Sequence, residues 1–408
     1  MRLFSLFLAS MAVIAGPLKA ATLHTGHGQR YPTLAAAAAA AVPGDSILIY
    51  PGNYPGNVSL DGLQGAPGRW IYICAAEPGT VVFQGGENAW RGSGNAYLHI
   101  HGMVFEKQTG NGLNFDDGGQ ASSPAHHLVF DQCVFRDMAA TGNNDLLKLS
   151  GANDFTVMHC TFLNGAAGGS GIDMVGCHNG SVFQCRFENL GANGVQMKGG
   201  SSDIRVEACF FKNAGSRAIN LGGSTGTAFF RPADAAWEAA RLTVCANVFT
   251  GSDVPVAFVG CTESIVVNNT IYKPARWAIR ILQENKDTVR FAKCGGNTFR
   301  NNIVYTDGQM RAACSIGPGT AAETFTFSHN LWFHAGDPGW RGPQLPVPEN
   351  GSLTGKDPLF PAAGQGDFSI PPDSPAAGAG FPASVANRDH ARTRFRSPRA
   401  IGAFEVKE

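Results

Sequence analysis

Residues 128–135 read LVFDQCVF, and the same pattern returns as FTVMHCTF (155–162), GSVFQCRF (180–187) and IRVEACFF (204–211). Four later segments keep the apolar positions but carry asparagine in place of the aligned cysteine: LTVCANVF (242–249), IVVNNTIY (265–272), TFRNNIVY (298–305) and FTFSHNLWF (325–333). A repeat of roughly 20–25 residues, lengthened by insertions, is typical of a solenoid whose coils bury apolar side chains only against the coils above and below. The segments therefore predict an all-β chain wound as a parallel β-helix.

Aligned on their last apolar residues, the eight segments share one column: Cys133, Cys160, Cys185, Cys209, Asn247, Asn269, Asn302 and Asn330. An inward asparagine can satisfy buried backbone groups along such a stack, and a small cysteine can replace it. We therefore expect a buried ladder. Disulfides between neighbours stay open, because stacked Cα atoms lie ~4.8 Å apart. A metal site in this column is disfavoured because no CxxC pair occurs.

A second series of strands follows the first, and its members alternate between apolar and polar positions: NGLNFD (111–116), DLLKLS (145–150), SGIDMV (170–175), NGVQMK (193–198), RAINLG (217–222), VPVAFV (254–259) and WAIRIL (277–282). Alternate residues of a strand point to opposite faces. The predicted inward column is Leu147, Ile172, Val195, Ile219, Val256 and Ile279. The predicted outward column is Asn114, Lys148, Asp173, Gln196, Asn220, Ala257 and Arg280, with Asp116, Ser150, Val175 and Lys198 in the next column.

The two ends of the chain differ from the repeats. Residues 1–20 begin with a basic residue, continue with a short apolar run and end at Ala20, which predicts a cleaved secretory signal peptide and a secreted or periplasmic protein. Residues 32–42, PTLAAAAAAAV, predict a short helix that caps the first coil of a domain spanning 21–356. Residues 357–408 are rich in proline and glycine, and we expect an irregular segment that covers the other end.

Composition narrows the range of partners. The chain carries 31 basic and 31 acidic residues, so it lacks the net positive charge that a nucleic-acid partner requires. No later segment is long and apolar enough to predict a membrane span. We expect a monomer.

The segment YPTLAAAAAAAVPGDSILIYPGNY (31–54), the VxxCxF and VxNNTI repeats, and the DPLF, SPAAGAG and IGAFE motifs of the tail resemble the pectate-lyase-like superfamily. The likeness covers nearly the whole chain after the signal peptide and matches no single lyase family. It implies a single-stranded right-handed parallel β-helix that binds an extended polysaccharide, and an activity as lyase, hydrolase or epimerase.

A lyase acting on uronic acids needs a cation to neutralise the substrate carboxylate and a base to remove the proton at C5. Lys148 and Lys198 are the candidate bases, and Arg217 and Arg280 are the candidate neutralising cations. A Ca²⁺ ion could also neutralise the carboxylate, and its hard oxygen ligands would be Asp116, Asp145 and Asp173.

Further candidates line the same face. Asn114, Asp116, Gln196 and Asn220 are outward and polar, which suits a linear glycan. Two insertions, 223–242 and 283–297, follow strands of this face and should form one wall over it. They contribute Arg231, Trp237 and Glu284 as candidate substrate contacts, although their aromatic side chains could instead form a small core under the loops.

Three alternatives to a lyase stay open from sequence alone. A glycoside hydrolase needs two carboxylates across the scissile bond, and the candidate pairs are Asp116 with Asp173 and Asp116 with Asp117. A C5-epimerase would begin with the same proton abstraction as the lyase. A glycan-binding or adhesion solenoid would use the same face without chemistry.

Overall fold

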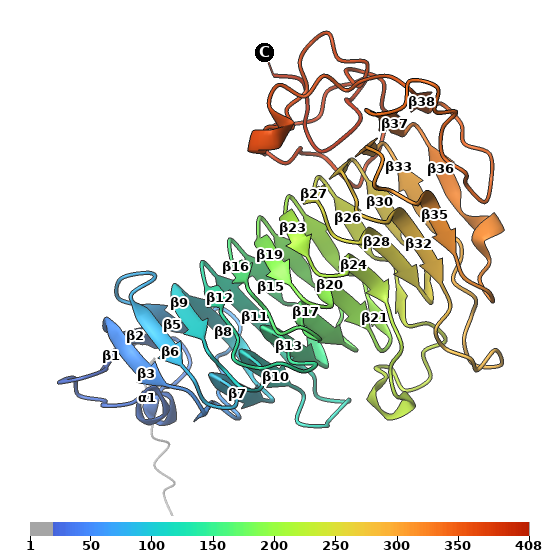
Figure 1. Ribbon diagram of the computed structural model, residues 1–408. Coiled ribbons are helices and arrows are strands. Elements are labelled where there is room, and N and C mark those ends of the chain that lie inside the picture. The colour runs from blue at the N-terminus through green and yellow to red at the C-terminus, as the bar shows by residue number, and fades with distance from the viewer. Residues whose placement is uncertain (1–18, 408) are drawn as a thin grey trace, which may run out of the picture.

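The computed structural model describes residues 19–407, and its strands stack in parallel coils along one axis (Figure 1). The predicted signal peptide lies outside these residues, apart from its last two positions. None of the helices within 19–407 has the length and apolar character needed to cross a membrane.

Three long parallel sheets form the faces of the solenoid. One face comprises β1 (Thr22–Thr25), β2 (Ser46–Ile49), β5 (Ile71–Ala75), β8 (Ala96–His101), β11 (Ala125–Asp131), β14 (Ala152–Asn153), β15 (Thr156–Met158), β18 (Ser181–Phe183), β22 (Arg205–Glu207), β26 (Thr243–Cys245), β30 (Ile265–Val267), β33 (Thr298–Arg300) and β36 (Thr326–Ser328). We call this face sheet A.

The second face, sheet B, comprises β3 (Gly52–Pro55), β6 (Val81–Gln84), β9 (Met103–Glu106), β12 (Val134–Arg136), β16 (Thr161–Leu163), β19 (Arg186–Leu190), β23 (Phe210–Ala214), β27 (Val248–Thr250), β31 (Thr270–Tyr272), β34 (Ile303–Thr306), β37 (Leu331–His334) and β38 (Leu353–Thr354). The third face, sheet C, comprises β4 (Val58–Ser59), β7 (Trp90–Ser93), β10 (Leu113–Asp116), β13 (Leu147–Ser150), β17 (Ser170–Val175), β20 (Asn193–Lys198), β24 (Arg217–Gly222), β28 (Val254–Val259), β32 (Trp277–Leu282) and β35 (Ala312–Ile316). A small fourth sheet joins β21 (Ser201–Ser202), β25 (Ala239–Ala240) and β29 (Cys261–Thr262).

The predicted cysteine and asparagine column is confirmed as a buried ladder. The Asn247 amide accepts from the Cys209 backbone N–H at 2.8 Å, and Asn269, Asn302 and Asn330 repeat this bond one coil at a time. All ten cysteines, which lie within the described residues, are free thiols. On sheet B, Phe135, Phe162, Phe187, Phe211 and Phe249 stack with ring centroids 4.7–4.8 Å apart. Like residues therefore stack into two ladders in the core, one of asparagine side chains and one of phenylalanine rings.

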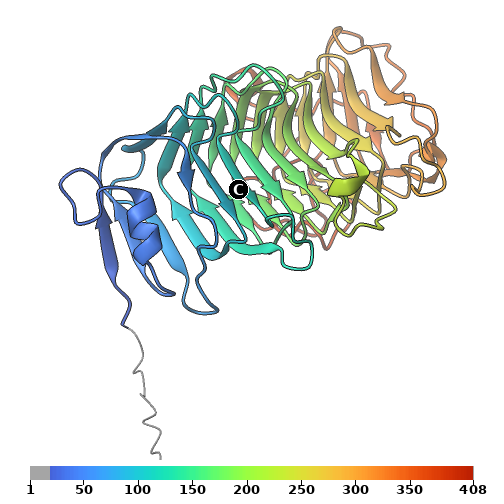
Figure 2. The same ribbon diagram turned by 90° about the horizontal axis from the view of Figure 1, so that it is seen from below.

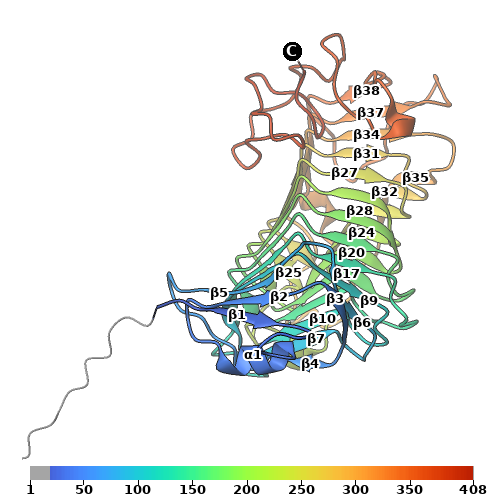
Figure 3. The same cartoon turned by 90° about the vertical axis from the view of Figure 1, so that its left-hand side faces the viewer.

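The predicted cap is also confirmed. The helix α1 (Leu34–Ala40) begins at Thr33, whose hydroxyl accepts from the Ala36 N–H at 3.2 Å. Its Leu34, Ala37 and Ala38 are buried against the core of the first coil, and the view from the N-terminal end shows the helix beside that coil (Figure 3).

The tail reaches the last coils but also runs back along the solenoid. Ile370 and Ile401 pack with Leu331 of β37, whereas Phe395 packs with Cys245 of β26 and Arg392 pairs with Glu207 of β22. The core of the last coil is covered partly by the loop before β38, where Trp340 and Leu345 pack on it. The tail therefore packs along one edge of the solenoid in addition to covering an end.

The remaining short helices are η1 (Thr227–Phe229), η2 (Ala322–Thr324) and η3 (Ala363–Gln365).

Candidate functional site

The register of sheet C confirms the predicted columns. Asn114 pairs with Lys148, Lys148 with Asp173, Asp173 with Gln196, and the series continues through Asn220 and Ala257 to Arg280. The intervening residues Leu147, Ile172, Val195, Ile219, Val256 and Ile279 are fully buried in the core. The outward residues therefore lie on one face, as expected.

The outward face is not open along its whole length, which corrects the expectation of a continuous polar strip. Asn220 is 1% exposed and Ala257 is fully buried. Ala257 belongs to an apolar cluster on the outer side of the sheet with Val254, Val259 and Trp277. Arg280 on β32 is partly exposed at the far end of the column, and the other partly exposed residues lie nearer the N-terminus, on β10, β13 and β20.

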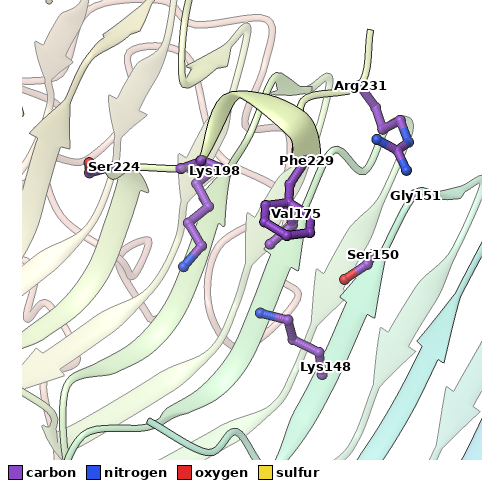
Figure 4. A pocket seen from close by; sticks show the side chains of 10 residues that line it. Lys148, Ser150, Gly151, Val175, Lys198, Ser224, Phe229 and Arg231 are labelled. Atoms are coloured by element: carbon purple, nitrogen blue, oxygen red, sulfur yellow. The ribbon is translucent and has the colours of Figure 1, made fainter. Parts of the chain in front are cut away.

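A cleft of 360 Å³ lies over this part of the sheet, at β13, β17 and β20. Its floor is formed by Lys148, Ser150, Val175 and Lys198, and the first insertion forms its wall with Thr225, Phe229 and Arg231. In the close-up, the two lysine side chains extend toward each other below Phe229, and Arg231 lies above Ser150 (Figure 4). The cleft is therefore cationic on its floor and aromatic on one side.

Two buried carboxylates lie beside the lysine ammonium groups. Lys148 forms a hydrogen-bonded ion pair with Asp173 and lies 3.6 Å from Asp145. Lys198 lies 3.3 Å from the other Asp173 oxygen. Asp145 and Asp173 are each 3% exposed. One carboxylate is thus shared between two cations.

Burial alone would lower the pKa of Lys148, but the charges of Asp173 and Asp145 outweigh it and raise the pKa above its ordinary value. Burial, and then the charge of Asp173, raise the pKa of Asp145. Lys148 therefore holds its proton, which is opposite to what a base role requires and suits a cation that binds a carboxylate.

The other candidate cations lie elsewhere. Arg217 is paired with Glu284 at 2.7 Å and donates to Asn220 at 3.4 Å. Arg280 lies five strands from Lys148, roughly 24 Å away at ~4.8 Å per strand, and stacks on Trp277. Burial, followed by the charge of Arg217, lowers the pKa of Arg280. Arg280 therefore lies far from the lysine cleft, and Arg217 is held in an ion pair by Glu284 of the second insertion.

The three predicted calcium ligands do not converge within the described residues, where the only close group of three or more metal-ligand side chains is found on another face. Asp116 instead accepts from the Ser93 hydroxyl at 2.6 Å and the Gly118 N–H at 2.8 Å. The Lys148 ammonium contacts both Asp145 and Asp173. The calcium prediction was wrong because the sequence shows the column in which Asp116 lies but not the donors that already occupy its oxygens, Ser93 and Gly118.

The remaining polar candidates make contacts within the sheet. Gln196 accepts from the Lys198 ammonium at 3.3 Å and donates to the Gly222 carbonyl at 3.3 Å. Asn114 donates to Asp116 at 3.4 Å. Gln196 therefore belongs to the cleft, whereas Asn114 lies beside the Asp116 turn.

The two insertions form one wall, as predicted. Phe230 and Ala235 of the first pack with Phe291 of the second, and the Ala292 N–H donates to the Ala236 carbonyl at 2.8 Å. Trp237 packs on this cluster, which is the small loop core that the sequence left open as an alternative to sugar contact. Figure 2 shows the first insertion projecting from sheet C.

Two acidic residues hold the wall in place, a role that the sequence did not predict for either of them. Buried Asp117 accepts from Arg231 at 2.9 Å and so ties the wall to the coil of β10. Buried Glu238 accepts from the Gly199 N–H at 2.9 Å, the Thr225 N–H at 2.8 Å and the Asn285 amide. The sequence showed Asp117 only as a neighbour of Asp116 and Glu238 only as a carboxylate inside a long insertion, and neither signal specifies its partners.

We expect that Glu238→Ala loosens the wall without unfolding the solenoid, because four donor groups, including the Thr225 hydroxyl, would lose their acceptor, at about 1–3 kcal/mol each. Limited proteolysis with chymotrypsin should then cut within 223–242, at Phe229 or Phe230, at least tenfold faster. Glu323→Ala, at an exposed carboxylate in the short helix η2 outside both insertions, is the control. Equal cleavage rates in both variants would contradict the anchoring role.

Comparison with known proteins identifies the architecture. A family model described as "Right handed beta helix region" matches residues 89–232. The fold is a right-handed parallel β-helix. No curated protein sequence matches the chain.

Three solved structures share this β-helix. The pectate lyase Pel9A is 16% identical with a TM-score of 0.63, covering 95% of this chain and 97% of that one. A rhamnogalacturonan lyase is 14% identical with a TM-score of 0.53, covering 80% and 89%. The A-module of the Azotobacter vinelandii mannuronan C-5 epimerase AlgE6 is 12% identical with a TM-score of 0.50, covering 77% and 91%. At such identities the likeness establishes the fold, and any activity must be argued from the site.

Proposed function

We propose that this β-helix is a secreted polysaccharide lyase that cleaves a uronic-acid-containing glycan by β-elimination in the sheet C cleft. The observation that carries the proposal is the convergence of Lys148 and Lys198 on the single carboxylate of Asp173, beneath a wall that presents Phe229 and Arg231. The relatives named above include two lyases and an epimerase of uronic-acid polymers, which supports a glycan as the ligand.

The charges of the cleft suit an anionic sugar. Lys148, Lys198 and Arg231 line it, whereas the carboxylates that balance them are buried beneath or behind the surface. Phe229 is 64% exposed, an unusual value for phenylalanine, and its ring borders the same space. A uronate could therefore place its carboxylate on the cations and its apolar face on the ring.

Lys148 and Lys198 have different roles in the proposed elimination. Lys148, held charged by two carboxylates, neutralises the substrate carboxylate and makes the C5 proton more acidic. Lys198 has one carboxylate contact, which it shares with Lys148, and it lines the same cleft, so we assign it the role of base. In this reaction the Lys198 amine takes the C5 proton, the C4–O bond breaks as the C4=C5 double bond forms, and the leaving oxygen takes a proton from water.

A hydrolase is less consistent with the geometry. Asp116 and Asp173 lie in different columns, Asp173 is nearly fully buried, and Asp116 already accepts three hydrogen bonds. These carboxylates do not face each other across an open site, as glycoside hydrolysis requires.

The deciding experiment incubates the protein with alginate, pectate and glycosaminoglycans, with and without a chelator. A lyase generates an ultraviolet-absorbing unsaturated uronide from at least one polymer. Reducing ends without that absorbance would indicate a hydrolase, a changed uronate composition without cleavage an epimerase, and retention of unchanged polymer a binding protein. Each of these three results would overturn the proposal.

We expect Phe229→Ala to raise KM about tenfold and leave kcat within about twofold, because stacking of about 1–1.5 kcal/mol is lost equally from substrate and transition state. Initial rates on the polymer identified above measure both constants. Phe381→Ala, at an exposed phenylalanine of the tail, is the matched control. An unchanged KM for Phe229→Ala would remove the ring from the binding site.

A further inference from the structure

Three histidines gather around one aspartate on the outer face of sheet A, away from the sheet C cleft. His99 and His101 are alternate residues of β8, so both imidazoles emerge on the same side of the strand. Asp131 ends the neighbouring strand β11 and pairs in register with His101. His159 follows β15 on the next coil. Three consecutive coils thus contribute to one cluster.

The contacts centre on the carboxylate of Asp131, which is 8% exposed. One oxygen lies 3.1 Å from His101 Nδ1 and 3.7 Å from His99 Nε2. The other oxygen lies 3.0 Å from His159 Nδ1. Within residues 19–407, His99, His101 and Asp131 are the only His, Cys, Asp or Glu side chains that bring three potential ligand atoms within 4.8 Å of one another.

The cluster has an unsatisfied atom that points to a ligand. His99 Nε2 is buried and makes no hydrogen bond within the described part of the chain, although it faces the Asp131 carboxylate. A buried imidazole nitrogen without a partner is costly.

The spacing fits a small tetrahedral ion. Bonds of 2.0–2.1 Å to a tetrahedral Zn²⁺ place neighbouring ligand atoms ~3.3 Å apart. The two measured nitrogen–oxygen distances, 3.1 and 3.7 Å, lie on either side of this value, so small side-chain rotations would admit the ion. Two imidazoles and one carboxylate are also the donor types that Zn²⁺ and its first-row neighbours accept, whereas Ca²⁺ requires more oxygens.

We propose that His99, His101 and Asp131 bind one divalent transition-metal ion, with Zn²⁺ as the best fit, and that His159 positions the Asp131 carboxylate. The ion would join the coils of β8 and β11, and three protein ligands would leave a fourth position for water. The site is independent of the proposed lyase activity, since its residues lie on a different sheet from Lys148 and Lys198.

Titration of the full chain with ZnCl₂ in a calorimeter tests the proposal, with Co²⁺ absorption spectra as a report on the ligands. We expect one equivalent to bind and the melting temperature to rise. His101→Gln and Asp131→Asn should weaken binding on the order of 100-fold, and His159→Gln about tenfold. His126→Gln, on the same strand as Asp131, should bind like the wild type.

Cysteine is the main competing source of a zinc signal. Cys74 pairs in register with His101 and is the nearest partly exposed thiol. Cys74→Ser should therefore retain the site, and the Co²⁺ spectrum should lack a thiolate charge-transfer band. Absence of stoichiometric binding in the wild type, unchanged affinity in both His101→Gln and Asp131→Asn, or loss of binding in Cys74→Ser would each overturn the proposal. Circular dichroism confirms that every variant is folded.

Discussion

Lys198→Met should lower kcat on the susceptible polyuronate by about 10²–10⁴-fold, the range expected when a general base is removed. The methionine keeps most of the aliphatic length of lysine, and Lys198 lies at the end of β20, where its ammonium contacts Asp173 and Gln196. Release of unsaturated product, followed by absorbance, measures the effect. KM should change much less, because Lys148 and Arg231 still bind the carboxylate.

Lys212→Met is the matched control, since Lys212 is exposed on β23 of sheet B. It should retain wild-type kcat. Lys148→Met separates the two lysine roles, because loss of the neutralising cation should raise KM as well as lower kcat. If Lys198→Met retained more than about a tenth of the wild-type kcat, Lys198 would not be the base, although the cleft could still be the active site.

The largest effect on stability is expected for Asn269→Ala, which we expect to lower the free energy of unfolding by about 3–5 kcal/mol. The Asn269 side chain is fully buried and accepts from the Asn247 backbone N–H at 2.9 Å. It also donates to the carbonyls of Val244 and Val267 and to the Asn302 amide. Alanine leaves these groups buried without a partner and adds a small cavity. Chemical denaturation followed by circular dichroism measures the loss.

Asn53→Ala, on exposed β3, should change the unfolding free energy by less than about 0.5 kcal/mol. A similarly small change for Asn269→Ala would show that water replaces the side chain in the ladder. In that case the asparagine column would fill space without contributing to the stability of the coils.

The cysteines of the same column make a different contribution. The Cys209 sulfur accepts a weak hydrogen bond from the Cys185 N–H at 3.4 Å, and the Cys185 thiol donates weakly to the carbonyls of Val157 and Phe183. The column thus changes from thiol packing in the earlier coils to amide bonding in the later ones. Since the thiols are free and buried, the coils are held by packing and backbone pairing.

Much of this protein could be predicted from the sequence because the solenoid is locally periodic. Each coil contacts only its neighbours, so the repeat around Cys133, Cys160 and Cys185 defines which residues stack, and strand alternation defines which residues face outward. The placement of Lys148 beside Asp173 follows directly from that register.

Only the tertiary structure decided what the insertions and the turns do. Arg231 reaches Asp117 across 114 positions of the chain, and the His99 cluster depends on where His159 leaves its strand. The burial of Asn220 and Ala257 likewise depends on what covers the sheet. Repetition specifies the neighbours of a residue within the coils, whereas loops are not periodic, so their contacts depend on the packing of the whole chain.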